Sequence, residues 1–186
     1  MPCLANQLLL PGAPAALTAS LAKYSTNYEQ VFDEVHQRLQ SNGHATMLDL
    51  AGLIGWKHVQ NAPWMHELYV LPSGTVQATT ATAFAPELAD AQRVAALGGL
   101  PGYRSGGAFT SVLLTAWDPS TFGVFDTLAN GVRSHVVDAG CGCNWDDLPT
   151  YFEHLRRLAL ELSGATGTPW TPRQEDMTMF ILGGGK

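Results

Sequence analysis

Charged side chains are scarce in this chain of 186 residues, where they make up only 14% of the sequence. Ten lysines and arginines stand against sixteen aspartates and glutamates, so the formal net charge is −6. That sign is wrong for a protein that binds nucleic acid mainly by releasing counterions from phosphates. Any contact with nucleic acid must therefore depend on a local site.

Cysteine is scarce as well. Cys3, Cys141 and Cys143 are the only three, and a bridge between the last two would close a strained loop over one glycine. We therefore expect reduced thiols and a cytoplasmic location. The Cys-Gly-Cys pair has no second pair after it, and His135 and His154 lack the close spacing of zinc ligands. We predict no metal site and interpret the pair as small residues of an irregular loop.

Long uninterrupted apolar runs are missing too, although hydrophobic residues make up 46% of the chain and suffice for a core. Met1–Ala22 has no basic residue before Lys23 and is interrupted by Pro11 and Pro14. The segment matches neither a signal peptide nor a membrane span. The length suits one domain, so we expect a single-domain protein without membrane contact.

Helical periodicity dominates what is present, and capping signals or prolines mark several helix starts. The predicted helices run from Thr26–Glu29 to Gln40, from Leu48 to Trp56, from Pro86 to Leu97, from Tyr151 to Leu162, and from a capping box at Thr171 past Met177, Phe180 and Ile181. Tyr69–Thr82 is rich in β-branched residues but lacks strict alternation, so we expect irregular structure there. The fold class is therefore all-α, with about six to nine helices.

The segment Leu97–Trp117 differs from this helical background. A helix ends in glycines, a short Pro-Gly turn follows, and a second helix rich in small residues begins, which is the pattern of a helical hairpin. The turn would present backbone amide groups near a helix N-terminus, a geometry that binds one phosphate without lysine. The residues expected at this phosphate are Pro101, Gly102, Tyr103, Arg104, Ser105, Gly106 and Gly107.

One acidic residue follows the hairpin at a predicted helix start. Asp118-Pro119 ends the second helix, the apolar run Phe122–Phe125 comes next, and Asp126 precedes the helical segment Thr127–Val136. The commonest role of such an aspartate is to cap the helix. The alternative is a carboxylate held at the mouth of a helix for chemistry.

Together these residues resemble the helix-hairpin-helix DNA glycosylase superfamily, in particular small bacterial proteins with an 8-oxoguanine-glycosylase-like fold. Leu100-Pro101-Gly102 matches the hairpin turn of that superfamily, Ala108 an early alanine of the next helix, and Val124-Phe125-Asp126 the apolar stretch that ends in the essential acid. Three further segments are similar to other helices of that superfamily: Gly55-Trp56-Lys57, Tyr151–Arg156 and Gln174–Phe180.

The resemblance implies a single-domain helical bundle of the glycosylase type. Its core would span residues 46–183, with residues 1–45 as an N-terminal helical segment packed on the same domain and residues 184–186 as a flexible tail. It implies no cofactor beyond a monovalent cation at the hairpin, and no metal. We expect the protein to be a monomer.

The implied activity is hydrolysis of the N-glycosidic bond of a damaged or modified base in DNA. Asp126 would stabilise the positive charge that develops on the sugar and activate water. Bifunctional branches of the superfamily carry a lysine two residues before the alanine, where this chain has Gly106. The resemblance therefore implies a monofunctional enzyme. The second hairpin glycine would fall at Arg104, or at Gly106 if the turn is longer.

The implied partner is double-stranded DNA with one base flipped out of the stack into a pocket of aromatic and polar groups. The candidate pocket residues are Trp56, Lys57, His58, Gln60 and Trp64, together with Met177 and Phe180. Lys57 is also the candidate for an alternative amine nucleophile, and its simpler role is to complement the C-terminal end of its helix. Trp56 and Trp64 have packing as their simpler role.

The sequence leaves the base and the wider role open. Oxidised guanine, an alkylated base and a modified base of phage DNA all fit, so both DNA repair and phage defence are compatible. A second reading is a non-catalytic helix-hairpin-helix module that binds DNA or a protein, with Asp126 only a cap; the acidic charge and the missing lysine favour it. An unrelated helical hydrolase fits less well because no Gly-x-Ser-x-Gly elbow or metal-spaced histidines occur.

Overall fold

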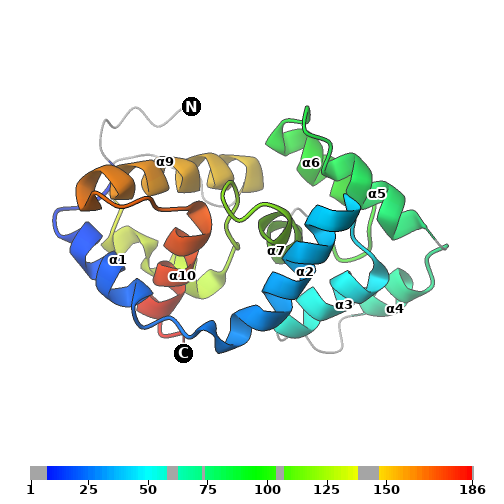
Figure 1. Ribbon diagram of the computed structural model, residues 1–186, viewed down its shortest axis with the longest axis horizontal. Helices are drawn as coiled ribbons and strands as arrows, with labels where there is room; N and C mark the ends of the chain where they lie inside the picture. Colours follow the sequence, from blue (N-terminus) through cyan, green and yellow to red (C-terminus); the bar gives the residue numbers. More distant parts are fainter. Residues whose placement is uncertain (1–7, 58–62, 73, 104–106, 138–146, 186) are drawn as a thin grey trace. The chain divides into compact units, whose positions relative to one another are not determined.

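The computed structural model describes residues 8–57, 63–72, 74–103, 107–137 and 147–185 (Figure 1). Within these ranges every regular element is a helix, and the sole β-type pairing is an isolated bridge between Leu9 and Val137. The predicted all-α class is confirmed. The chain divides into two compact units, one formed by residues 1–25 with 119–186 and the other by residues 26–118. We call them unit 1 and unit 2.

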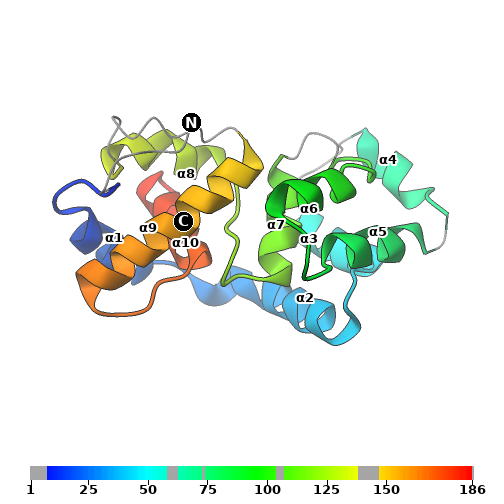
Figure 2. The same ribbon diagram turned by 90° about the horizontal axis from the view of Figure 1, so that it is seen from above.

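Unit 1 joins the two ends of the chain. It contains α1 (Ala13–Leu21), α8 (Thr127–Val132), the 3-10 turn η2 (Arg133–His135), α9 (Leu148–Thr166) and α10 (Pro172–Leu182). Helix α10 packs against α1, α8 and α9 (Figure 2). The buried apolar core between these helices includes Leu17, Leu158, Leu162 and Met179. The Glu161 carboxylate accepts the N–H groups of Leu8 and Leu9 and so anchors the segment before α1.

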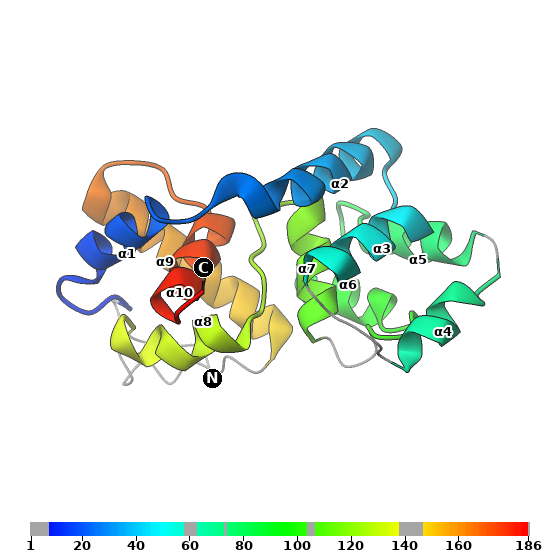
Figure 3. The same cartoon turned by 90° about the horizontal axis from the view of Figure 1, so that it is seen from below.

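Unit 2 consists of helices packed around α7. It contains the 3-10 turn η1 (Thr26–Tyr28), α2 (Glu29–Asn42), α3 (Met47–Trp56), α4 (Trp64–Tyr69), α5 (Thr75–Ala83), α6 (Asp90–Leu97) and α7 (Ala108–Trp117). Helix α2 packs on α3 and α7, and α5 packs on α6 (Figure 3). The part of α7 from Thr110 to Ala116 is buried. A helix that is buried all round lies in the core, so α7 is the central helix of unit 2.

Several helix predictions are confirmed, and the best is α10. Thr171 accepts the Gln174 N–H at 3.2 Å, and the Gln174 side chain accepts the Thr171 N–H at 3.0 Å, which completes the predicted capping box. Pro172 occupies the first helical position, where its missing N–H has no helical partner to lose.

The prediction of irregular structure over Tyr69–Thr82 is wrong. Helix α5 begins at Thr75, and its threonines direct their hydroxyls at the helix itself: Thr80 and Thr82 donate to the carbonyls of Val76 and Ala78. Packing against α6 stabilises this helix more than its low intrinsic propensity destabilises it.

Two further expectations need correction. The helix expected from Pro86 begins at Asp90, because the buried Arg93 guanidinium binds the carbonyl oxygens of Ala83 and Pro86 and holds the preceding turn. The described residues form ten α-helices, more than the predicted range. Helices α1, α4 and α5 have no counterpart among the predicted ones. In α1, Pro14 lies in the first turn, a position that accepts proline.

Candidate functional site

The two helices expected to form the hairpin are α6 and α7 of unit 2, and residues 104–106 between them lie outside the described residues. Helix α6 ends at Leu97, the Leu100 N–H donates to the Leu97 carbonyl at 2.9 Å, and the Tyr103 N–H donates to the Leu100 carbonyl at 3.0 Å. Gly102 has φ +84°, and a Cβ there would lie 2.5 Å from the Trp64 ring. Only glycine fits both the backbone conformation and the close approach.

Two of the predicted phosphate contacts do not present side chains to solvent. Pro101 is buried, and the Tyr103 ring is fully buried, where burial raises the pKa of its hydroxyl well above the usual range. The Tyr103 ring packs against Phe109 in the interior, and the Tyr103 N–H donates to the Leu100 carbonyl. Arg104, Ser105 and Gly106 lie outside the described residues.

Helix α7 begins directly after the hairpin. Gly107 is its N-cap, and among the described residues no side chain caps this end and no acid lies in the first turn. The first N–H groups of a helix lack partners within the helix and carry partial positive charge. This end of α7 can therefore bind an anion such as a phosphate.

Asp126 lies in unit 1 as the N-cap of α8. Its Oδ1 accepts the Leu128 N–H at 2.8 Å, and the residue is half-buried. The predicted helix start at Thr127 is confirmed.

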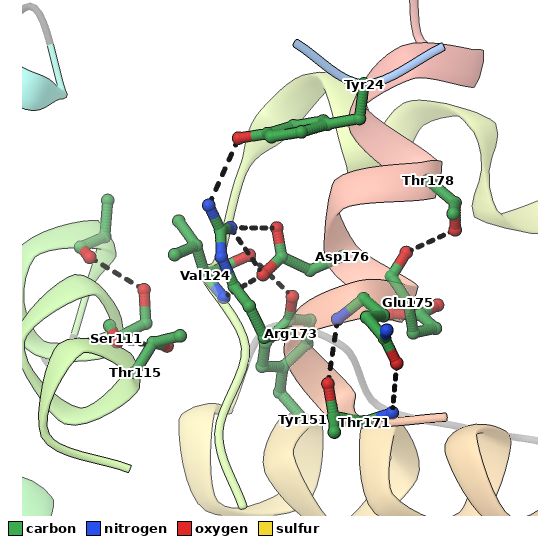
Figure 4. Close-up of polar contacts among 12 residues, drawn as sticks. Tyr24, Ser111, Thr115, Val124, Tyr151, Thr171, Arg173, Glu175, Asp176 and Thr178 are labelled. Carbon is green, nitrogen blue, oxygen red and sulfur yellow. Dashed lines mark hydrogen bonds and ion pairs between the residues drawn. The ribbon is translucent and has the colours of Figure 1, made fainter. Parts of the chain in front are cut away.

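The backbone before Asp126 is held by two side chains. The Val124 N–H donates to Oδ2 of Asp176 at 2.8 Å, and the Val124 carbonyl accepts the Tyr151 hydroxyl at 2.8 Å (Figure 4). All three residues are buried. The N–H and the carbonyl of Val124 therefore both have hydrogen-bond partners, although Val124 lies in neither a helix nor a strand.

Close packing fixes the same segment. A Cβ on Gly123 would lie 2.5 Å from Leu155 Cδ1 and 2.9 Å from the Pro172 carbonyl oxygen. The Phe122 ring meets the Phe152 ring edge-on, with ring centres 4.8 Å apart. The predicted apolar run before Asp126 is thus a packed extended segment with little room to shift.

A buried ion pair lies behind Tyr151. Arg133 donates to Glu175 at 2.7 Å and to the Tyr151 hydroxyl at 3.2 Å. Burial raises the pKa of Glu175 to about 7, against the opposing effect of the Arg133 charge. Among the described residues no hydrogen-bond partner reaches Oε2 of Glu175.

A second buried pair supports Asp176. Arg173 binds both carboxylate oxygens of Asp176, at 3.0 and 2.9 Å, and its other terminal nitrogen donates to the Tyr24 hydroxyl at 3.2 Å (Figure 4). The ion pair leaves Asp176 oriented to accept the Val124 N–H. Tyr24 comes from the N-terminal part of unit 1 and Arg173 from α10.

Five supporting residues were not predicted from the sequence as part of a site: Arg133, Tyr151, Arg173, Glu175 and Asp176. One signal was available. In a chain with few charges, three of them fall within four residues of α10, at positions that the helix buries.

The predicted pocket residues are distributed over both units. In unit 2, Trp56 packs on Phe32 with ring centres 5.3 Å apart, and Trp64 meets Phe109 edge-on at 5.0 Å beside Gly102. Lys57 is the half-buried C-cap of α3. Packing within unit 2 therefore explains the positions of Trp56 and Trp64.

Met177 and Phe180 lie in unit 1 and are half-buried on α10. His58 and Gln60 lie outside the described residues. Among the predicted site residues that the structure describes, Trp64 and Gly102 are a pair that lies close together, with the Trp64 ring next to the Gly102 backbone.

Among the described residues, no group of three or more histidine, cysteine, aspartate or glutamate side chains could hold a metal ion. No helix within the described ranges is both long and apolar enough to cross a membrane.

No protein-family model, curated protein or solved structure matches this chain.

Proposed function

We propose that this protein is a DNA glycosylase that releases a damaged or modified base by hydrolysis of the N-glycosidic bond, with Asp126 as the catalytic carboxylate. The observation that carries the proposal is the placement of Asp126, half-buried at the start of α8 and directly after a segment held by Tyr151 and Asp176. A carboxylate held rigidly stabilises positive charge without first reorganising its surroundings. That is what cleavage of a glycosidic bond demands, because the sugar becomes cationic as the base leaves.

The hairpin of unit 2 supports a DNA partner in spite of the acidic net charge. The N-terminal end of α7 offers backbone N–H groups and the positive end of a helix, which bind a phosphate without lysine. A monovalent cation at the hairpin belongs to the same proposal.

In the proposed reaction, water is the nucleophile. The base leaves the stack before it is released, Asp126 stabilises the sugar cation and takes a proton from the attacking water, and an abasic site remains. Oxidised guanine, an alkylated base and a modified base of phage DNA are the candidate substrates. We propose a monomeric protein that acts in the cytoplasm, in repair or in phage defence.

A second candidate is a non-catalytic helix-hairpin-helix module that binds DNA or a protein. The capping bond from the Leu128 N–H to Asp126 favours it, because that bond by itself explains an aspartate at this position. The net charge of −6 favours it as well.

Asp126→Asn distinguishes the two candidates. Asparagine keeps the size and the capping oxygen but removes the charge, so we expect the variant to fold while base release slows by about 10²- to 10³-fold. The assay uses a panel of duplexes that each carry one modified base, and measures abasic sites by alkaline cleavage.

The matched control is Asp147→Asn. Asp147 is the N-cap of α9 in the same unit, and its carboxylate accepts the Thr150 N–H at 3.1 Å. The control should leave base release unchanged. Equal rates for Asp126→Asn and the wild type would reject the catalytic role, and duplex binding without release of any base would favour the module.

A further inference from the structure

We propose that Tyr151 is a positioning residue for Asp126. This inference rests on the proposed function and assigns a role to a side chain within it. The first observation is the bond from the Tyr151 hydroxyl to the Val124 carbonyl at 2.8 Å. That carbonyl belongs to the peptide group that joins Val124 to Phe125, the residue before Asp126, so its orientation helps to set the direction in which the chain enters the α8 N-cap.

The Tyr151 ring holds the next residue as well. It meets the Phe125 ring edge-on, with ring centres 5.3 Å apart. Tyr151 therefore contacts the backbone of Val124 and the side chain of Phe125, the two residues that precede Asp126. A side chain that fixes both a peptide group and the adjacent side chain restricts rotation of the segment.

The direction of the hydroxyl proton follows from its neighbours. Arg133 has only N–H donors, so the bond at 3.2 Å between Arg133 and Tyr151 makes the tyrosine oxygen an acceptor there. The single phenolic proton is thereby directed at the Val124 carbonyl. Burial raises the pKa of Tyr151 well above its usual range, which keeps that proton in place.

Arg133 connects Tyr151 to the other end of α8. It is the C-cap of the helix that Asp126 begins, and its Nε donates to Asn130 within that helix at 3.3 Å. Glu175 holds the guanidinium at 2.7 Å. Tyr151 thus contacts the segment before Asp126 directly and the helix after it through Arg133. The same buried residues therefore hold the chain on both sides of Asp126.

The test is Tyr151→Phe, which removes the hydroxyl and keeps the ring. We expect kcat for base release to fall by about 10- to 100-fold with KM within about twofold of wild type, because the carboxylate is displaced while the DNA contacts are unchanged. A residue that only stabilised the fold would lower the unfolding temperature without this split between kcat and KM at temperatures where the protein stays folded.

Tyr69→Phe is the control. It removes a hydroxyl from an exposed tyrosine of α4, outside the network that supports Asp126, and it should leave kcat within about twofold. If Tyr151 acts through Asp126, the double variant Asp126→Asn/Tyr151→Phe should lose no more activity than Asp126→Asn alone. Full multiplication of the two losses would overturn the role.

Should Tyr151→Phe fail to fold, Phe125→Leu tests the same support from the other side. Phe125 is half-buried, and the change removes the ring contact with Tyr151. A lower kcat at unchanged KM supports the role, and an unchanged kcat overturns it. Release of no base by the wild type overturns the proposed function and this role with it. Wild-type release with an unaffected Tyr151→Phe overturns only the role.

Discussion

Glu175 should make the stability of the protein fall as the pH rises from 5 to 8. Its carboxyl group is buried, and burial is the main cause that raises its pKa to about 7 from an ordinary 4.5. A carboxyl group with a raised pKa binds its proton more tightly in the folded than in the unfolded state. Its contribution to stability is therefore fully present below pH 4.5 and is lost as the pH rises to 7.

The magnitude follows from the two pKa values. With a pKa of 4.5 in the unfolded chain and about 7 in the folded one, the contribution falls by about 2–3 kcal/mol between pH 5 and pH 8. Glu175→Gln keeps the shape and an oxygen that can accept from Arg133, but it cannot titrate. The free energy of unfolding of the wild type, minus that of the variant, should fall by this amount over the same range.

The assay is urea unfolding followed by circular dichroism at pH 5, 6, 7 and 8, for the wild type and Glu175→Gln. Glu87→Gln is the control, because Glu87 is exposed in unit 2 and the same chemical change there should leave the pH profile unchanged. A difference between wild type and Glu175→Gln that stays constant within about 0.5 kcal/mol would refute the reasoning. A difference that grows with pH would show that the Arg133 charge outweighs burial.

Two further predictions concern packing before Asp126 and the nucleophile. Gly123→Ala should destabilise the protein by about 1–3 kcal/mol in urea unfolding, because the new Cβ would meet Leu155 and the Pro172 carbonyl at 2.5 and 2.9 Å. Gly131→Ala, where nothing lies within 4 Å, should be neutral or stabilising, and equal effects of the two changes would contradict the packing argument. Borohydride added during base release should trap no covalent adduct, with strand breaks only after alkali, since water and not an amine is the proposed nucleophile. A trapped adduct that disappears in Lys57→Ala would make Lys57 the nucleophile.

The helices that could be predicted from the sequence are those whose signals are local. The capping box at Thr171 and the proline after it determine where α10 begins, whatever packs around it. Where tertiary contacts compete with local preference, prediction failed. Arg93 holds the turn at Pro86 through carbonyls seven and ten residues away, and α5 forms against the preference of its threonines.

The candidate site divides in the same way. The position of Asp126 at a helix start could be predicted from its order after the hairpin and the apolar run, and the structure places it at the N-cap of α8. The residues that hold the segment before Asp126 could not be predicted. The ion pair between Arg133 and Glu175 joins residues 42 apart, and the bond between Val124 and Asp176 joins residues 52 apart. No periodicity relates such positions.

The sequence by itself determined the all-α class and the start of α10, because helix periodicity and capping are properties of neighbouring residues. Only the tertiary structure decided that residues 1–25 fold together with residues 119–186. It also decided that Tyr151 and Asp176 hold the two polar groups of Val124. The physical reason is burial: a polar group removed from water must find its partner wherever the folded chain brings one.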